Sequence, residues 1–92
     1  MTPRYAAKVD ANQSEIVDAL RQVGASVFPL FRVGQGCPDL LVGFGETYLM
    51  EVKTDKGKLT PDEEQWIRDW QGREVAIVRS PEEALRVIGL YE

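Results

Sequence analysis

The chain has 92 residues, a length typical of one domain, and 43% of its residues are hydrophobic. This content is enough for a buried core and argues against a disordered chain. A domain of this size buries only a modest share of its surface, so its stability as a monomer is expected to be marginal. We therefore treat residues 1–92 as a single domain.

The composition excludes several classes of site. Histidine is absent, so no mechanism that needs an imidazole is available. The single cysteine, Cys37, allows neither an internal disulfide nor a cysteine zinc site. The chain contains no long apolar run, and residues 1–10 lack the apolar segment of a signal peptide, so we expect a cytoplasmic protein without a membrane span. A net charge of −4 argues against tight, purely electrostatic binding of nucleic acid by one monomer, although an acidic protein can still carry a basic groove.

The first predicted element is a helix over residues 12–23. Asn12 is a candidate N-cap, Glu15 stands where it would close a capping box, and Gly24 supplies the stop. Glu15 has an alternative role as a site residue. The apolar residues that recur at helical spacing are Ile16, Ala19, Leu20 and Val23.

Three strands are predicted next. The first covers residues 26–32, where Pro29 indicates an edge strand or a bulge. A loop with two glycines and a proline, residues 33–38, leads into an almost continuous apolar run over residues 39–44, as expected for a buried strand. Residues 48–53 form the return strand of a hairpin.

A second helix begins at Thr60-Pro61, where Glu63 completes a capping box, and runs to about Trp70. A strand over residues 74–79 follows, and a repeat of the capping signature at residues 80–83 opens a last helix. The order α-β-β-β-α-β-α predicts an α/β domain with a mixed sheet and helices on its faces.

The candidate chemistry lies in the hairpin. Alternation along a strand puts Glu51 and Lys53 on one face and leaves Met50 and Val52 for the core. The turn brings Asp39 back alongside Glu51. Two carboxylates at that separation are a hard oxygen site suited to Mg²⁺, and a lysine beside a buried strand is costly unless it is paired or functional.

Each part of this pattern also has an ordinary structural explanation. Glu-x-Lys on a strand is often a solvated face with a weak ion pair, and Pro38-Asp39 is a common turn pair. The combination is more informative than its parts, because Pro-Asp opens a buried strand and Glu-x-Lys ends the next one.

The segments 36–43 and 48–53 resemble the motif of PD-(D/E)xK nucleases. More closely, the chain resembles the stand-alone VRR-NUC domains of phages and bacteria, and more distantly the archaeal Holliday junction resolvases. The resemblance spans nearly the whole chain, including the leading helix and the helix start at Thr60-Pro61. It implies a restriction-endonuclease-like α-β-β-β-α-β core, to which this chain adds a C-terminal helix.

The resemblance also implies roles for single residues. Asp39 and Glu51 would bind Mg²⁺ or Mn²⁺ with the Val52 carbonyl as a further ligand, and Lys53 would act on the attacking water. Many relatives carry another Glu on the first helix, and the matching position here holds Gln13. An amide oxygen can ligate a metal or a metal-bound water without adding charge.

Five further residues are weaker candidates for DNA binding. Arg32 either touches the scissile phosphate or is a surface arginine. The glycines Gly34 and Gly36 either let a DNA backbone approach or make a turn. Lys56 and Lys58 follow the motif on an exposed loop, where lysines often have no specific partner.

Three side chains have a structural explanation that we favour over a functional one. We expect Glu63 to cap its helix, although it shares the inner face with Trp66. Trp66 and Trp70 are expected in the core or an interface rather than as platforms for bases. No thiol chemistry is expected at Cys37, which has no second cysteine or histidine near it.

These observations lead to a metal-dependent endonuclease acting on structured DNA. One active site cuts one strand, so a homodimer suits a Holliday junction or other branched DNA. Two alternatives stay open: a nuclease for flaps, nicked duplex or single strands, and a non-catalytic DNA-binding or assembly module that keeps the fold. The expected setting is a bacterial cell or a phage-infected host.

Overall fold

The computed structural model describes residues 4–90, with side chains from Asn12 onward. The helices are α1 (Arg4–Gln22), α2 (Pro61–Asp69) and α3 (Pro81–Val87), and the strands are β1 (Ser26–Pro29), β2 (Leu40–Phe44), β3 (Glu46–Val52) and β4 (Ala76–Val78). The predicted order of elements is confirmed. No helix in the described residues is long and apolar enough to cross a membrane.

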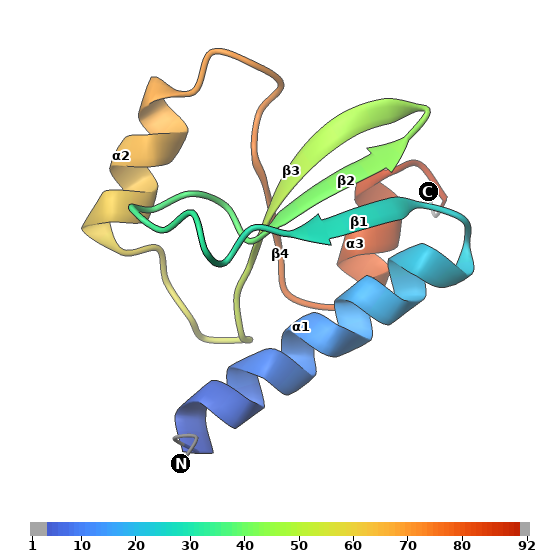
Figure 1. Ribbon diagram of the computed structural model, residues 1–92, viewed down its shortest axis with the longest axis horizontal. Coiled ribbons are helices and arrows are strands. Elements are labelled where there is room, and N and C mark those ends of the chain that lie inside the picture. The colour runs from blue at the N-terminus through green and yellow to red at the C-terminus, as the bar shows by residue number, and fades with distance from the viewer. Residues whose placement is uncertain (1–3, 91–92) are drawn as a thin grey trace.

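The four strands form one mixed sheet in the order β1-β2-β3-β4 (Figure 1). The first three strands pair antiparallel through short connections, and β4 lies parallel to β3 because the chain returns through α2. The predicted mixed sheet is therefore confirmed. Strands β1, β2 and β4 are shorter than predicted, whereas β3 begins two residues earlier, at Glu46, and ends one residue earlier, at Val52.

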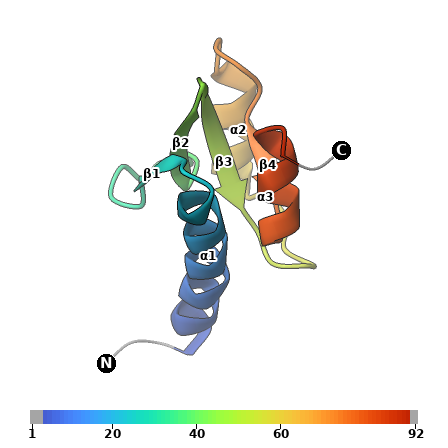
Figure 2. The same ribbon diagram turned by 90° about the vertical axis from the view of Figure 1, so that its right-hand side faces the viewer.

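One face of the sheet carries the core. The alternating residues Leu40, Val42, Met50 and Val52 are buried there, as the hairpin pattern predicted for Met50 and Val52. Helices α1 and α3 contact each other and cover this face, which Figure 2 shows edge-on. Helix α1 contributes Ile16 and Leu20 to the core, and both are fully buried. The predicted apolar stripe is confirmed for Ile16, Ala19 and Leu20, but Val23 lies beyond the end of α1 and is 39% exposed.

The predicted start of the first helix is wrong. Helix α1 begins at Arg4, so Asn12 lies inside it and is not an N-cap. The Asn12 side chain instead donates a hydrogen bond from Nδ2 to the Lys53 carbonyl at 3.2 Å, which ties α1 to the end of β3. Glu15, which had been assigned to the same cap, is exposed to solvent.

Strand β1 ends at Pro29 and not at Arg32, and it is an edge strand as Pro29 predicted. Leu30 N donates to the Asp39 carbonyl, and hydrogen-bonded pairs alternate along an antiparallel ladder. The backbone N–H and C=O positions of Val27 and Pro29 therefore point away from β2, toward the open edge of the sheet. Proline has no N–H to offer there, and Arg21 donates from its guanidinium to the Val27 carbonyl at 2.8 Å. The edge is therefore protected against pairing with another strand.

The predicted capping signatures of the later helices are present. Thr60 accepts from Glu63 N, and the Glu63 carboxylate accepts from Thr60 N, which completes the box at α2. At α3, Ser80 accepts from Glu83 N, but the Glu83 carboxylate accepts from Arg79 N at 2.7 Å. In the second capping box the Glu83 carboxylate therefore accepts from the N–H of Arg79, the residue before the N-cap, and not from the N–H of Ser80 itself.

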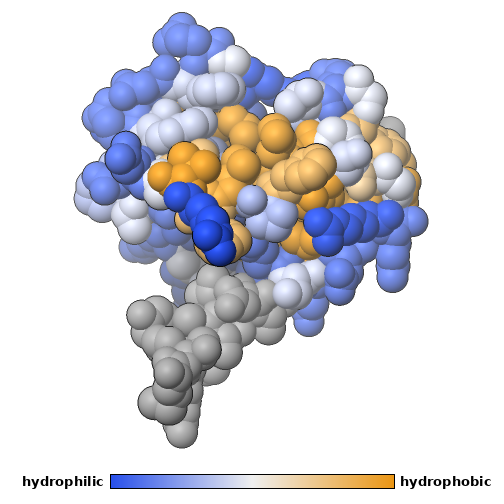
Figure 3. Space-filling model, in the orientation of Figure 1, coloured by the Kyte–Doolittle hydropathy of each residue, from blue (hydrophilic) through white to orange (hydrophobic). Residues whose placement is uncertain are grey.

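The opposite face of the sheet is largely open. Helix α2 stands at one end of the sheet, apart from α1 and α3, and has no fully buried residue (Figure 1). Apolar residues gather in the middle of the face shown in Figure 3. Phe28 on β1 is 61% exposed and Ile77 on β4 is 41% exposed. The flanking helices predicted for both faces therefore cover one face fully and the other only at its end.

The loop before β2 packs closely on α2 at Gly36. A Cβ at this position would lie 2.4 Å from the Asp62 carbonyl oxygen, and its φ of +85° is one that side chains disfavour. Gly34 has a φ of +70° but open space around it. Of the two explanations offered for these glycines, the geometry supports a structural need at Gly36.

We predict that Gly36→Ala destabilises the fold more than Gly34→Ala. Both variants carry the cost of a side chain at positive φ, about 1 kcal/mol, and only the first adds a clash with the backbone of α2, worth about 1–3 kcal/mol. Urea unfolding of both variants measures the difference. Equal losses of unfolding free energy would show that the loop moves away from α2 without cost.

Candidate active site

The hairpin brings Asp39 and Glu51 together. Leu40 pairs with Met50 in the ladder between β2 and β3, so the preceding Asp39 stands opposite Glu51. The Asp39 carboxylate accepts a hydrogen bond from Val52 N at 2.7 Å. This bond fixes one carboxylate oxygen and leaves the other for a ligand. The juxtaposition predicted from the alternation of β3 is present.

Glu51 is a buried acid at the centre of the site. Its exposed fraction is 2%, and it is the one charged residue in the buried part of the described chain. Burial, the neighbouring charge of Asp39 and the bond and charge of Glu63 raise the pKa of Glu51 to about 8. Burial also raises the pKa of Asp39, against the bond from Val52 N. At neutral pH the metal-free pair therefore keeps a proton on Glu51, which a bound cation would displace.

Lys53 directly follows β3, and its side chain lies on the same side as that of Glu51. Its Nζ lies 3.4 Å from Glu51 Oε2 and 2.7 Å from Glu63 Oε1. Burial lowers the pKa of Lys53, but the bond with Glu63 and the charges of Glu51 and Glu63 outweigh it, and the pKa is raised. The side chain is therefore an ammonium at neutral pH, which donates hydrogen bonds and cannot accept a proton.

Glu63 does more than the cap assigned to it from the sequence. Its Oε1 accepts from Thr60 N at 2.9 Å and from Lys53 Nζ at 2.7 Å. One carboxylate thus closes the first turn of α2 and holds the lysine of the site. The sequence carried a hint of this, since Glu63 shares the inner face of the helix with Trp66, but the cap was a sufficient explanation.

The donor set fits a hard divalent cation. Asp39 and Glu51 offer carboxylate oxygens, the ligands that Mg²⁺ and Mn²⁺ prefer. Among the described residues no three acidic, histidine or cysteine side chains gather as a ready-made metal cage. Backbone carbonyls and waters would therefore supply the remaining ligands, as is usual for Mg²⁺. A cation would also relieve the excess charge that raises the pKa of Glu51.

A cleft of about 670 Å³ opens beside Asp39. Gln13 and Val17 of α1 form one wall, and Pro29 and Phe31 form another. Gln13 is thus placed in the same cleft as Asp39, where the resemblance assigned it. Glu15 does not line this cleft, so neither of the roles considered for Glu15 is supported.

The remaining candidate DNA contacts are spread around the site. Arg32 is exposed on the turn after β1, and Lys56 is exposed on the loop after β3. Lys58 lines a smaller hollow of about 200 Å³ together with Lys53. The loop after β3 is exposed, as predicted, and it is also anchored, because the Arg79 guanidinium donates to the carbonyls of Thr54 and Gly57 at 2.6 and 2.8 Å.

The two tryptophans do not belong to the buried core. Trp66 and Trp70 stack on each other with ring centroids 5.0 Å apart, and Trp70 is 43% exposed. The core half of that prediction is wrong, and the interface half stays open. Cys37 lies near the acidic pair, where burial and then the charges of Glu51 and Asp39 raise the pKa of its thiol.

Comparison with known proteins identifies the fold. No protein-family model matches the chain, and no curated protein sequence matches it. A solved structure described as "VRR_NUC domain" is 26% identical, with a TM-score of 0.68, over 92% of this chain and 98% of that chain. The resemblance to VRR-NUC domains is thus confirmed. The structure of this chain is therefore similar to that of a VRR_NUC domain, and it is a single α/β domain with a nuclease-like fold.

The pKa of Glu51 makes the stability of the metal-free protein depend on pH. The ordinary value is 4.5 and the folded value is about 8, so the folded state binds this proton more tightly. The resulting stabilisation is fully present below about pH 4.5 and is lost as the pH rises through 8. We expect the unfolding free energy of the wild type to fall by a few kcal/mol across this window, relative to Glu51→Gln.

Chemical denaturation at a series of pH values, in the presence of a chelator, measures this difference. Glu51→Gln is the matched control because its neutral amide cannot titrate. Added Mg²⁺ is expected to restore the wild type at the alkaline end and to help the variant less. Parallel pH profiles for the two proteins would contradict the assignment of a raised pKa to Glu51.

Proposed function

We propose that this VRR-NUC domain is a metal-dependent endonuclease that hydrolyses phosphodiester bonds in structured DNA, with Holliday junctions or other branched DNA as its substrate. The observation that carries the proposal is the meeting of Asp39, Glu51 and Lys53 at the end of β3, beside an open cleft. Two carboxylates and an ammonium are the groups that phosphodiester hydrolysis needs.

The residues divide the chemistry between them. Asp39 and Glu51 would hold the cation, with the Val52 carbonyl as a further ligand. Bound Mg²⁺ or Mn²⁺ would supply a Lewis acid for the scissile phosphate and its attacking water. Lys53, kept as an ammonium by Glu51 and Glu63, donates hydrogen bonds that orient the water and stabilise the charge developing on the phosphate oxygens. The raised pKa of Lys53 favours this role over proton abstraction.

A homodimer is the second part of the proposal. Symmetric cutting of a four-way junction needs two active sites, and a two-fold dimer supplies them. The open, apolar sheet face opposite α1 and α3 supports self-association, because exposed apolar area of this kind is unusual on a monomer (Figure 3). The protected edge of β1 favours a contact through side chains over a shared sheet.

A non-catalytic DNA-binding module is the alternative from another class. Gln13 and the net charge of −4 give it support. The buried Glu51 argues against it. A carboxylate that is destabilised by its surroundings costs folding free energy, and a binding module would have no use for that cost.

Cleavage of a labelled four-way junction tests the proposal. We expect paired, symmetric nicks that require Mg²⁺ or Mn²⁺ and leave 5′-phosphate and 3′-hydroxyl ends. Asp39→Ala is expected to lower the rate by more than about a hundredfold, because it removes a ligand of the cation. Flap, nicked and single-stranded DNA of matched sequence serve as comparison substrates.

The outcomes separate the alternatives. Faster cleavage of flaps or single strands than of the junction would reassign the substrate and keep the chemistry. Binding of DNA by a folded protein that cuts none of the panel would leave the binding module. Sedimentation at assay concentrations reports the oligomeric state independently of activity.

Glu63 offers a second test, because α3 provides a matched control. Glu63 and Glu83 both stand at the third position of a helix that begins with proline, and each accepts a backbone N–H. Only Glu63 also contacts Lys53. We expect Glu63→Ala and Glu83→Ala to lose similar unfolding free energy, about 1 kcal/mol, whereas only Glu63→Ala lowers kcat, by about tenfold or more.

Steady-state cleavage and thermal unfolding of both variants make the comparison. Glu63→Gln keeps the acceptors for Thr60 and Lys53 and is expected to recover most of kcat with little change in KM. A proportional loss of activity in Glu63→Ala and Glu83→Ala would show that Glu63 acts through stability alone.

A further inference from the structure

Phe31 is the most exposed large apolar side chain in the described part of the chain. It follows β1 on a turn in which Val33 N donates to the Leu30 carbonyl at 3.0 Å, so the backbone that carries it is fixed. Its side chain is 70% exposed and adds nothing to the core. The ring is therefore available to a partner in solution.

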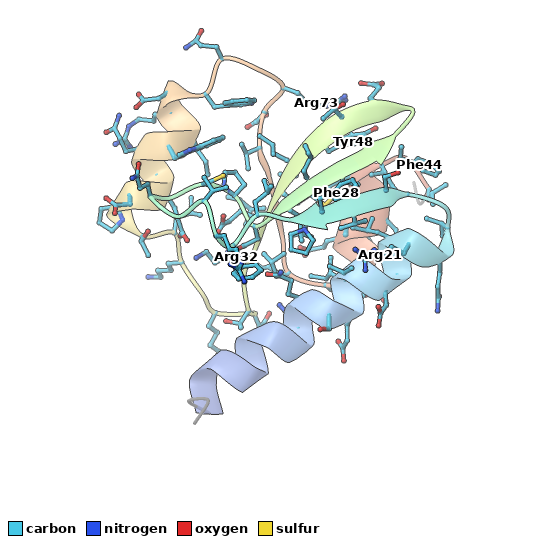
Figure 4. All side chains as sticks on the ribbon, viewed as in Figure 1. Arg21, Phe28, Arg32, Phe44, Tyr48 and Arg73 are labelled. Carbon is cyan, nitrogen blue, oxygen red and sulfur yellow. The ribbon has the colours of Figure 1, made fainter. Side chains whose placement is uncertain are left out.

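The position of the ring points to the active site. Phe31 lines the same cleft of about 670 Å³ as Asp39, together with Gln13 and Pro29. The ring therefore stands at the mouth of the space through which a substrate reaches the acidic pair. Phe28, which is also exposed, lies over the sheet and does not line this cleft (Figure 4).

A cation accompanies the ring. The Arg32 guanidinium lies 5.5 Å from the centroid of Phe31, and Arg32 is itself exposed. In Figure 4 the Arg32 side chain lies beyond the end of β1, on the side toward α2. An aromatic face next to an arginine offers a nucleotide both of the contacts it needs, stacking for the base and an ion pair for the phosphate.

We propose that Phe31 is a stacking platform for one unpaired base of the DNA substrate, with Arg32 on an adjacent phosphate. Bases inside a duplex already stack on their neighbours, so the ring can engage only a base at a branch point, a flap or a single strand. Phe31 thereby selects DNA in which an unpaired base lies next to the phosphate bound at Asp39. The inference rests on the proposed nuclease function and assigns the feature of branched DNA that this cleft recognises.

Fluorescence of 2-aminopurine tests the stacking directly. Splayed duplexes carry the probe as the first unpaired base of one arm or the other, and binding is measured with a chelator present so that metal-dependent cleavage does not intervene. We expect the wild type to quench the probe on one arm. Phe31→Leu keeps an apolar side chain but has no aromatic face, so quenching is expected to disappear and binding to weaken about tenfold.

Two further variants complete the design. Phe31→Trp restores an aromatic face and is expected to restore quenching. Val33→Ala removes another exposed apolar side chain of the same turn, 59% exposed and outside the cleft, and is expected to leave quenching unchanged. Blunt duplex of the same sequence is expected to bind the wild type and Phe31→Leu equally.

The outcomes that overturn the inference are distinct from those that overturn the nuclease proposal. Equal quenching by the wild type and Phe31→Leu, with DNA binding intact, removes the stacking role and leaves the nuclease in place. A shift of Phe31→Leu from dimer to monomer in sedimentation, without a change in quenching, reassigns the ring to self-association. Failure of the wild type to bind any of these DNAs overturns both.

Discussion

The structure depends on a single contact across the hairpin, where the Asp39 carboxylate accepts a hydrogen bond from Val52 N. The bond joins the first residue before β2 to the last residue of β3. It fixes the register that puts Met50 and Val52 into the core and Glu51 onto the opposite face. A slip of one residue would bury polar groups and expose the core, so the fold and the acidic pair are specified together.

The same register places acidic side chains close together, and Lys53 balances only part of their negative charge. Asp39, Glu51 and Glu63 meet one ammonium, Lys53, in a largely buried space. Helix α2 supplies Glu63 and so holds Lys53 from the side opposite to β3. Residual negative charge persists at Glu51 unless it takes up a proton or a cation balances it. A bound cation would therefore stabilise the fold as well as serve the proposed reaction.

Sequence reasoning reached the features that are local or periodic. The alternation in residues 48–53 predicted which side chains are buried, and Thr60 with Glu63 predicted the start of α2. The predictions were wrong or incomplete where the role of a residue depends on a partner that is distant in sequence. Asn12 looked like a helix cap because its partner, the Lys53 carbonyl, is remote in sequence. The second partner of Glu63 was hidden for the same reason, since the cap already accounted for the residue.

The same limit applies to the loop after β3 and the turn after β1. The run of polar residues at 54–58 predicted an exposed loop. Its hydrogen bonds from the Arg79 guanidinium could not be predicted, because Arg79 is distant in sequence and only the fold brings it close. The sequence pattern placed Phe31 inside the first predicted strand, but β1 ends two residues before it, at Pro29. Ending the strand there turns the ring out of the sheet and into the cleft.

Gln13 takes on a clearer meaning in this setting. The residue lines the cleft beside Asp39, at the place where the resemblance expects a glutamate. A glutamate there would add a further negative charge to a site that already has three carboxylates for one ammonium, and would raise the cost of folding without a cation. A neutral amide offers an oxygen to a ligand without that cost. An amide at this position is therefore compatible with an intact Asp39–Glu51 pair.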